Sequence, residues 1–249
     1  MDLGISGKTA LVSASSAGLG FATAAALAEA GCKTVISGRD EERLLHATSL
    51  IPDSVPIIAD VSTIKGSQTL VQKAKSELGT NIDILVTNAG GPPAGNFETT
   101  NVDQYLSAIE LNLMSVVAMC KETVPDMQEQ QWGRILAITS ISVRQPIPNI
   151  MLSNTARAGA TGFLKTMALE VAPDGVTVNS IQPGLHATNR VLEVYGEENM
   201  DELAQSVPAR KIGSAEDFGK IAAFLCSEHA NFITGAAIPV AGGTYGGLQ

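Results

Sequence analysis

The sequence predicts an α/β protein built on a doubly wound parallel sheet, with helices on both faces. Short runs rich in β-branched residues alternate with longer helical patterns, as expected when parallel strands are joined by helical crossovers. Runs such as Ile135 to Ile138 are continuous in apolar residues, which is typical of strands covered on both faces. Because the chain has 249 residues and 45% hydrophobic content, we expect a single domain over residues 1–249.

Seven strands and five long helices are expected in alternation. The strands are expected at Lys8–Ala14, Lys33–Ser37, Val55–Ala59, Asp83–Asn88, Arg134–Thr139, Thr177–Gln182 and Ala237–Val240. The helices are expected at Phe21–Ala30, Ser67–Leu78, Val102–Gln130, Thr155–Val171 and Ala215–Ser227. Gly31 is expected to end the first helix, and a break is expected in the third before Pro125. Glu41-Glu42-Arg43 indicates the exposed first turn of a further helix.

A long excursion is expected at about residues 185–213, between the sixth strand and the last helix. Long excursions in compact domains tend to form binding lids, so we expect a substrate lid here. Its apolar residues either suit an apolar ligand or pack the lid down. They are Leu192, Val194, Met200, Leu203 and Val207.

Composition excludes several classes of function. The formal net charge is −9 and the pI about 4.8, so a nucleic acid or an anionic membrane is not an expected partner. The three cysteines are too far apart in sequence for a paired motif, and no histidines have metal-ligand spacing, so we expect no disulfide framework and no metal site. We see no signal peptide and no apolar run of membrane-spanning length, and we expect a cytoplasmic protein.

A glycine-containing turn follows the first strand and opens the first helix. It reads Ser13-Ala14-Ser15-Ser16-Ala17-Gly18-Leu19-Gly20. At such a turn, backbone amides and the helix dipole can hold a pyrophosphate, and glycine lets the backbone approach it. Taken alone, this turn is about equally well explained by glycines that only make the bend.

The turn resembles the Thr-Gly-x-x-x-Gly-x-Gly fingerprint of the short-chain dehydrogenase/reductase family, and the resemblance continues along nearly the whole chain. Ser13 stands for the family's threonine, and Ala14 replaces its first glycine. Further matches are Asp60-Val61, Asn88-Ala89-Gly90, Asn112, Ser140, Val178-Asn179 with Pro183-Gly184, and C-terminal segments such as Ile233-Thr234-Gly235. The resemblance implies a Rossmann fold, a nicotinamide dinucleotide cofactor and a small-molecule substrate.

The end of the second strand indicates which dinucleotide is bound. Arg39 lies where an acidic residue would accept hydrogen bonds from a ribose 2′-hydroxyl, and a guanidinium instead pairs with a 2′-phosphate. We therefore expect NADP(H) rather than NAD(H). In the alternative interpretation, Arg39 is a surface arginine paired with Asp40 or Glu42.

Two catalytic positions depart from the family's pattern. In the family, a tyrosine protonates the carbonyl oxygen, a lysine four residues later lowers the pKa of that tyrosine and holds the nicotinamide ribose, and a serine and an asparagine assist. Ser140 and Asn112 match the assisting pair, but Ser153 and Arg157 stand in place of tyrosine and lysine. A serine hydroxyl is shorter and far less acidic than a phenol, and arginine can bind and stabilise without titrating.

Three replacements for the missing phenol are considered. We place first a water held by Ser140, Ser153 and Asn112, with Arg157 stabilising the developing oxyanion. His186, just after the Pro-Gly turn, is the second and Tyr195, in the lid, is the third. For both, an ordinary surface or lid role is the favoured interpretation. Ser142 is an alternative to Ser140 as the reactive serine, although strand alternation would place both on one side and give it a supporting role.

The resulting expectations are specific. The expected catalytic residues are Asn112, Ser140, Ser153 and Arg157. The expected cofactor contacts are Ser13, Ser15, Ser16, Gly18, Leu19, Gly20, Arg39, Asp60, Val61, Asn88, Ala89, Gly90, Arg157, Pro183, Gly184 and Thr188.

The function expected is that of a carbonyl or alcohol oxidoreductase, similar to 3-oxoacyl-acyl-carrier-protein reductases and their sugar- or alcohol-oxidising relatives. The alternative is a dinucleotide-binding sensor or assembly subunit whose redox chemistry has lapsed. A lyase or isomerase has no specific support in the sequence. The helix Thr155–Val171 carries small residues for close packing, and in the resembling family it lies at a subunit interface, which implies a homotetramer or dimer.

Overall fold

Seven parallel strands form one sheet in the order β3-β2-β1-β4-β5-β6-β7. The computed structural model describes residues 1–248, without the side chains of Arg190, Glu193 and Val194, so Gln249 of the predicted domain and the Val194 side chain of the predicted lid lie outside the described residues. The strands are β1 Thr9–Val12, β2 Lys33–Gly38, β3 Val55–Ile58, β4 Ile84–Thr87, β5 Gly133–Ile138, β6 Val176–Pro183 and β7 Ala237–Val240. The doubly wound fold class predicted from the sequence is confirmed.

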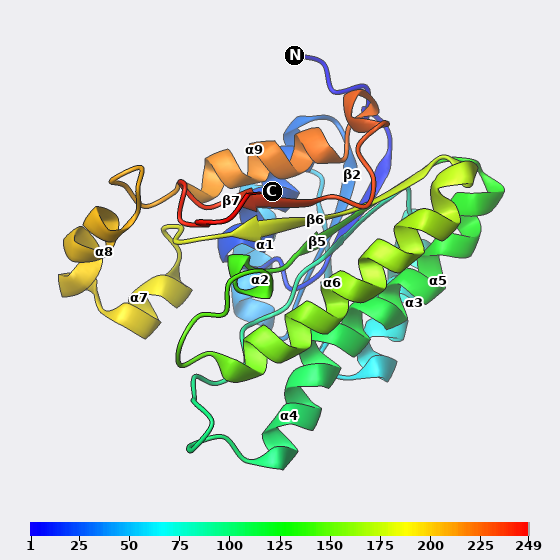
Figure 1. Ribbon diagram of the computed structural model, residues 1–249. Coiled ribbons are helices and arrows are strands. Elements are labelled where there is room, and N and C mark those ends of the chain that lie inside the picture. Colours follow the sequence, from blue (N-terminus) through cyan, green and yellow to red (C-terminus); the bar gives the residue numbers. More distant parts are fainter. Residues whose placement is uncertain (249) are drawn as a thin grey trace.

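Helices cover both faces of the sheet and enclose two cores (Figure 1). They are α1 Gly18–Glu29, α2 Glu41–Leu50, α3 Ile64–Leu78, α4 Val102–Ile109, α5 Ser115–Glu129, α6 Met151–Val171, α7 Asn189–Tyr195, α8 Met200–Ser206 and α9 Ala215–Leu225. Successive strand residues face opposite cores: on β1, Leu11 packs on the α3, α5 and α6 side, and Val12 on the α1 and α9 side. Burial on both faces explains why the central strands are continuous in apolar residues.

The predicted helix Val102–Gln130 is interrupted before Pro125, as expected, but well upstream of the proline. A π-helical turn, Glu110–Met114, separates α4 from α5 and contains Asn112. Helix α5 continues through Pro125, which is exposed, so the carbonyl of the exposed Lys121, which loses its hydrogen bond to a proline, can reach water. The π turn widens the helix where a candidate site residue lies, which is a common place for such turns.

Helix α6 begins at Met151, a full turn before the predicted start at Thr155. Two hydrogen bonds to residues outside the helix hold its first turn. The amide of Met151 donates to the carbonyl of Gly95 at 3.2 Å, and the Asn154 side chain donates to the carbonyl of Ile147 at 2.9 Å. The earlier start places Ser153 inside the helix.

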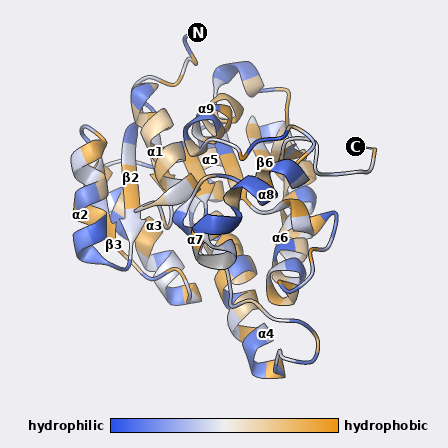
Figure 2. Cartoon of the chain, turned by 90° about the vertical axis from the view of Figure 1, so that its left-hand side faces the viewer, coloured by the Kyte–Doolittle hydropathy of each residue, from blue (hydrophilic) through white to orange (hydrophobic). Residues whose placement is uncertain are grey.

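The excursion between β6 and α9 contains α7 and α8 and extends away from the carboxyl end of β6 (Figure 1). Its two ends are joined by an isolated parallel bridge between His186 and Gly213. Figure 2 faces this excursion and shows mainly hydrophilic residues on α8. Among the described residues, no helix is both long and apolar enough to cross a membrane.

Candidate active site at the carboxyl edge of the sheet

The glycine-containing turn is held by reciprocal hydrogen bonds to the neighbouring strands. Ser13 Oγ donates to the carbonyl of Asn88 at 2.7 Å and accepts from its amide at 2.8 Å. On the other side, the amide of Ser15 donates to the carbonyl of Ser37 at 2.7 Å, and Ser15 Oγ accepts from the amide of Ser37 at 3.0 Å. Sequence reasoning missed Ser37, because the role of this residue depends on which strand lies beside β1. These side chains therefore fix the turn between β2 and β4.

Two positions in the turn show how closely its backbone approaches its surroundings. Ala14, in place of the family's first glycine, has φ +46°, in the left-handed region that costs a residue with a side chain about 1–2 kcal/mol. A Cβ built on Gly20 would lie 2.6 Å from Nδ2 of Asn88 and 2.8 Å from the carbonyl oxygen of Ala14. The turn tolerates alanine at the first glycine at some cost, and has no space for a side chain at the third.

The first turn of α1 presents backbone amides without a side-chain cap. Helix α1 begins at Gly18, earlier than predicted, and its N-cap residue Ala17 offers no side-chain acceptor. The amides of Gly18, Leu19 and Gly20 therefore stand at the positive end of a helix of twelve residues. Across the crevice, a Cβ built on Gly90 would meet nothing within 4 Å. Both features fit a phosphate-containing ligand lying between α1 and the end of β4.

The end of β2 presents an unpaired cation and a free hydroxyl. Arg39 is exposed and has no ion pair among the described residues, because Asp40 instead caps α2 by accepting from the amide of Arg43 at 2.9 Å. Gly38 allows Ser16 to approach, since a Cβ built there would lie 2.9 Å from Ser16 Oγ. Ser16 has no side-chain hydrogen bond in the described part of the chain, so Ser16 and Arg39 are both free to bind a phosphate.

Asp60 and Val61 follow β3 at the edge of the same crevice. Burial alone would raise the pKa of Asp60, but hydrogen bonds from Ser62 and the nearby charge of Arg39 outweigh it and lower that pKa. Asp60 is therefore ionised at neutral pH. The side chain of Val61 is buried in the core, which leaves its backbone as the part able to contact a ligand.

Ser140 is oriented by the turn that follows β5. The chain enters a short 3-10 helix, Ile141–Val143, and the amide of Ser142 donates to Ser140 Oγ at 3.1 Å. This bond uses an acceptor position of Ser140 and leaves its hydroxyl proton free to be donated. The expected strand alternation of the two serines was wrong, because the strand ends at Ile138. Ser142 is 2% exposed, so it supports Ser140 from behind.

Ser153 and Arg157 lie one turn apart on α6 and contact each other. Arg157 Nε donates to Ser153 Oγ at 3.2 Å, and Arg157 also donates to the carbonyls of Ile138 and Ala89, at 3.1 and 3.5 Å. Arg157 thus joins the carboxyl ends of β4 and β5. Burial lowers the pKa of its guanidinium to about 10. At neutral pH it remains charged by a wide margin.

Asn112 lines a small cavity together with Arg157, and neither Ser140 nor Ser153 lines that cavity. Its Nδ2 donates to the carbonyl of Gly90 at 3.1 Å, and its Oδ1 is buried without a partner among the described residues. The residue borders a small cavity of about 10 Å³. The cavity is lined by Thr87, Asn88, Ala89, Asn112, Ser115, Val116, Ile138, Thr139 and Arg157. Thr87 Oγ1 is a second buried atom without a partner, and sequence reasoning missed it because a strand threonine carries no distinctive signal.

The remaining expected residues lie at the base of the lid. Gly184 donates its amide to the carbonyl of Val240 at 3.0 Å, and a Cβ on Gly184 would lie 2.8 Å from that of Ala241. This close approach holds the Pro183-Gly184 turn at the end of β6. Thr188 lies beside Gly18. A Cβ built on Gly18 would lie 3.7 Å from Cγ2 of Thr188. A cavity of about 400 Å³ opens behind this contact, between α1, α9 and the lid base.

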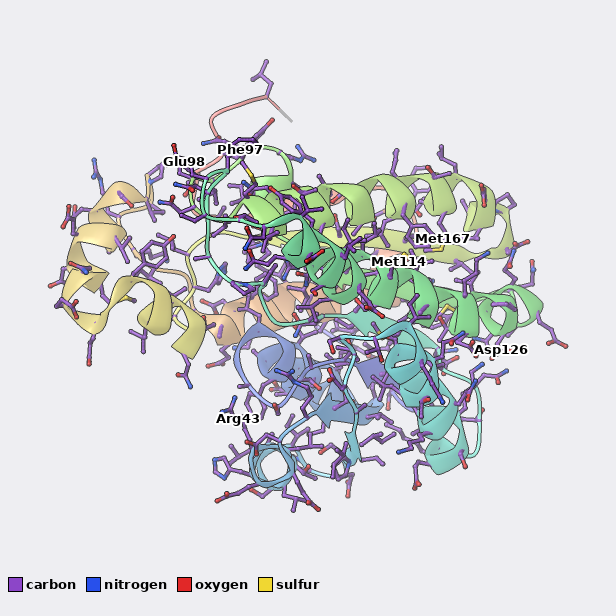
Figure 3. The ribbon with its side chains drawn as sticks, turned by 90° about the horizontal axis from the view of Figure 1, so that it is seen from below. Arg43, Phe97, Glu98, Met114, Asp126 and Met167 are labelled. Carbon is purple, nitrogen blue, oxygen red and sulfur yellow. The ribbon has the colours of Figure 1, made fainter. Side chains whose placement is uncertain are left out.

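Neither side chain considered as a substitute acid is grouped with Ser140. His186 is 4% exposed, its ring packs edge-on against Phe218 at 5.0 Å, and its Nδ1 lies 3.2 Å from the carbonyl of Gly184. Burial lowers the pKa of His186, so the ring is neutral at pH 7. Tyr195 is 38% exposed on α7. In Figure 3 the lid helices α7 and α8 project to the left of the molecule. In that view, Arg43 on α2 lies below them and Phe97, in the loop before α4, lies above them.

Comparison with known proteins shows which family the chain is similar to. Residues 13–245 match a family model described as enoyl-(acyl carrier protein) reductase. The chain is 32% identical over 243 residues to dehydrogenase/reductase SDR family member 4 of Sus scrofa, covering 95% of this chain and 87% of that protein. It is 33% identical over 240 residues to the 3-oxoacyl-(acyl-carrier-protein) reductase of Haemophilus influenzae, covering 96% of this chain and 98% of the relative.

Solved structures show the same similarity in three dimensions. L-sorbose reductase of Gluconobacter frateurii, solved with NADPH and L-sorbose, aligns over 100% of both chains with a TM-score of 0.94 and 31% identity. A 7α-hydroxysteroid dehydrogenase, solved with NADH and 7-oxo glycochenodeoxycholic acid, aligns over 100% of this chain and 98% of its own with a TM-score of 0.92 and 28% identity. These similar structures therefore hold either dinucleotide.

Proposed function

Because the chain belongs to the short-chain dehydrogenase/reductase family, we propose that it is an NADP(H)-dependent oxidoreductase acting on a carbonyl or alcohol, such as a 3-oxoacyl thioester or a sugar. The observation that carries the proposal is the position of Arg157, which binds Ser153 and reaches the carbonyls at the carboxyl ends of β4 and β5. Ser140 lies two residues after Ile138, where β5 ends. A dinucleotide in a doubly wound fold binds across this edge, at the point where the strand order reverses.

NADP(H) is supported by the free groups at the end of β2. A guanidinium without an ion pair and an unbonded hydroxyl on Ser16 together suit a phosphate monoester. NADPH in the similar L-sorbose reductase agrees with this choice. The uncapped amides of α1 and the open space at Gly90 would hold the pyrophosphate.

When bound, the nicotinamide supplies or accepts the hydride. Ser140 accepts a hydrogen bond from the amide of Ser142, and its own hydroxyl donates a hydrogen bond to the substrate oxygen. Arg157 keeps its charge at neutral pH and stabilises negative charge that develops on that oxygen. Ser153, held by Arg157 Nε, provides a second hydroxyl on the same side.

A water molecule is our proposed proton donor in place of the phenol. The small cavity beside Arg157 has about the space that one water needs, and Asn112 Oδ1 and Thr87 Oγ1 offer it acceptors. The cavity borders Arg157 rather than Ser140 and Ser153, so the guanidinium would hold the water and stabilise the developing oxyanion without itself transferring a proton. The burial of His186 against Phe218 gives no support to an acid role for that residue.

The proposal is tested by titrating NADPH into the purified protein and then screening turnover of ketones, sugars and 3-oxoacyl thioesters. Oxidation of NADPH by at least one of these classes supports the enzyme. The double variant Ser153→Tyr with Arg157→Lys restores the family's pair and is compared with each single variant. A large gain in rate would show that the native pair is weakened, and a loss would show that it is the working arrangement.

The second candidate function is a redox-lapsed sensor or assembly subunit. The observation that favours it is that Ser153 stands in place of the family's tyrosine. In the described part of the chain, neither His186 nor Tyr195 is grouped with Ser140 to donate the proton instead. The crevice serves this function equally well. Tight NADPH binding with no turnover of any substrate class, in the native protein and in the restored double variant, would support it.

We also propose that the protein is a homotetramer or dimer that pairs through the outer face of α6. The exposed residues of this face are Thr155, Ala158, Gly159, Gly162, Lys165, Thr166, Leu169 and Glu170. Leu169 is 70% exposed and is the largest apolar side chain on it. Analytical ultracentrifugation of the native chain and of Leu169→Glu tests the interface. The buried, unpaired cysteines suit a reducing compartment, and we propose the cytoplasm.

A further inference from the structure

Arg157 is a cation in a largely enclosed site without a counterion. Its three hydrogen bonds go to the hydroxyl of Ser153 and to the carbonyls of Ile138 and Ala89, all of which are neutral acceptors. Among the described residues it makes no ion pair. Burial is the only cause of the lowered pKa of its guanidinium, so no nearby carboxylate raises it. Arg157 is partly buried, and a charge withdrawn from water is normally paired, which makes this one unusual.

The other groups around the guanidinium are also uncharged. The small cavity beside it is lined, besides Arg157 itself, by apolar, hydroxyl and amide side chains, and by no Asp or Glu among the described residues. By contrast, Arg134, the buried arginine at the opposite end of β5, lies 3.5 Å from Glu228. The fold pairs its fully buried arginine, Arg134, and leaves the partly buried Arg157, at the ligand edge, without an ion pair among the described residues.

The position of Arg157 relates this charge to the reacting ring. Its bonds to Ala89 and Ile138 place it at the carboxyl ends of β4 and β5. In this fold the Gly18 turn, after β1, holds the pyrophosphate, and the nicotinamide half of a dinucleotide then extends over the strands on the β4 side. The oxidised nicotinamide ring carries a positive charge, and the reduced ring carries none.

We propose that the uncompensated charge of Arg157 makes this site discriminate between the redox states of its cofactor, binding the reduced dinucleotide more tightly than the oxidised one. This inference rests on the proposed function. Like charges less than about 10 Å apart, at an effective dielectric constant of about 20, repel enough to change a binding constant at least tenfold. The protein is therefore loaded with reduced cofactor and releases the oxidised form readily, which favours reduction of carbonyls over oxidation of alcohols.

The test is the ratio of dissociation constants for NADP⁺ and NADPH, measured by isothermal titration calorimetry without substrate. In the native protein we expect NADPH to bind at least about tenfold more tightly. Arg157→Lys keeps the charge and should keep the ratio, whereas Arg157→Met should lower it about tenfold, mainly through tighter binding of NADP⁺. Lys165→Met removes the same charge from an exposed position of the same helix and should leave the ratio unchanged.

A second variant keeps Arg157 itself. Asn112→Asp is nearly isosteric and places a carboxylate at the border of the guanidinium's cavity, so it should lower the ratio as Arg157→Met does. It also decides the matter if Arg157→Met does not fold. Equal ratios in the native protein, Arg157→Met and Asn112→Asp would overturn this inference and leave the proposed function intact. Failure of the native protein to bind either nucleotide would instead overturn the proposed function.

Discussion

Replacing Gly20 by alanine should disrupt the glycine-containing turn without touching any reacting group. The new Cβ would lie 2.6 Å from Nδ2 of Asn88, 2.8 Å from the carbonyl oxygen of Ala14 and 3.1 Å from the Cα of Ser15. The atoms of Ala14 and Ser15 belong to the backbone, so the Asn88 side chain is the group that can move. Relief of the steric clash therefore requires Asn88 to give up its 2.9 Å hydrogen bond to the carbonyl of Ala14.

The magnitude follows from three opposing contributions. Overpacking costs about 1–3 kcal/mol, and loss of the hydrogen bond adds about 1 kcal/mol. Alanine in place of glycine within a helix returns about 1 kcal/mol. We therefore expect the free energy of unfolding to fall by about 1–3 kcal/mol, and NADPH affinity to fall because the amides of the α1 first turn are displaced.

Urea unfolding, with the slope checked against the native protein, measures this change. Gly162→Ala is the matched control, because Gly162 also lies in a helix, yet a Cβ there meets nothing of the same chain within 4 Å. Because Gly162 lies on the proposed pairing face of α6, native protein and variants are compared at a concentration at which the chain is monomeric. The control should be neutral or stabilised by up to about 1 kcal/mol. If Gly20→Ala unfolds at the same urea concentration as the native protein and binds NADPH equally well, the close approach described for this turn is wrong.

Three further changes should give distinct results. Arg39→Glu should weaken NADPH binding at least about tenfold while leaving NADH binding unchanged or stronger, because a charge-assisted phosphate contact is replaced by repulsion; similar losses for both nucleotides would argue against a 2′-phosphate site. Burial lowers the pKa of His186 below its ordinary 6.5, so the unfolded chain takes up this proton first and stability should fall as the pH drops below about 6.5. In urea unfolding from pH 7 to 5, His186→Gln should reduce that loss and the exposed His46→Gln should not. Ala14→Gly should raise the free energy of unfolding by up to about 1 kcal/mol, since relief of the left-handed alanine exceeds the added flexibility of the unfolded chain; a destabilised variant would contradict the strain.

The parts of the fold that depend on local pattern could be predicted from the sequence. All seven strands lie within a residue or two of their expected positions. The central strands β1, β4 and β5 are buried on both faces and therefore leave continuous apolar runs. The first turn of α6 and the π turn around Asn112 could not be predicted. The former is held by Gly95 and Ile147, and the latter lies well upstream of Pro125, the residue that indicated a break.

The candidate site was predicted residue by residue, but its internal connections were not. The sequence placed Ser140, Ser153 and Arg157 in one region through resemblance, and the structure supplies the bond between the last two. The sequence could not show that Arg157 lacks a counterion, since the absence of an ion pair depends on every side chain around the guanidinium. The sequence also could not show that Asn112 lies beside the cavity of Arg157 and not beside Ser140. The position of Asn112 depends on the π turn that contains it.

The closed base of the lid has a consequence for how this protein can change. Because the amide of Ala187 donates to the carbonyl of Gly213, and that of Gly213 to the carbonyl of Leu185, the two ends of the excursion lie side by side. A further hydrogen bond, from the amide of Ala209 to the carbonyl of Gly242, ties the end of the excursion to the turn after β7. Residues 189–206, which contain α7 and α8, can therefore change while these ties and Thr188 are kept. New substrate preferences can evolve by exchange of this one segment.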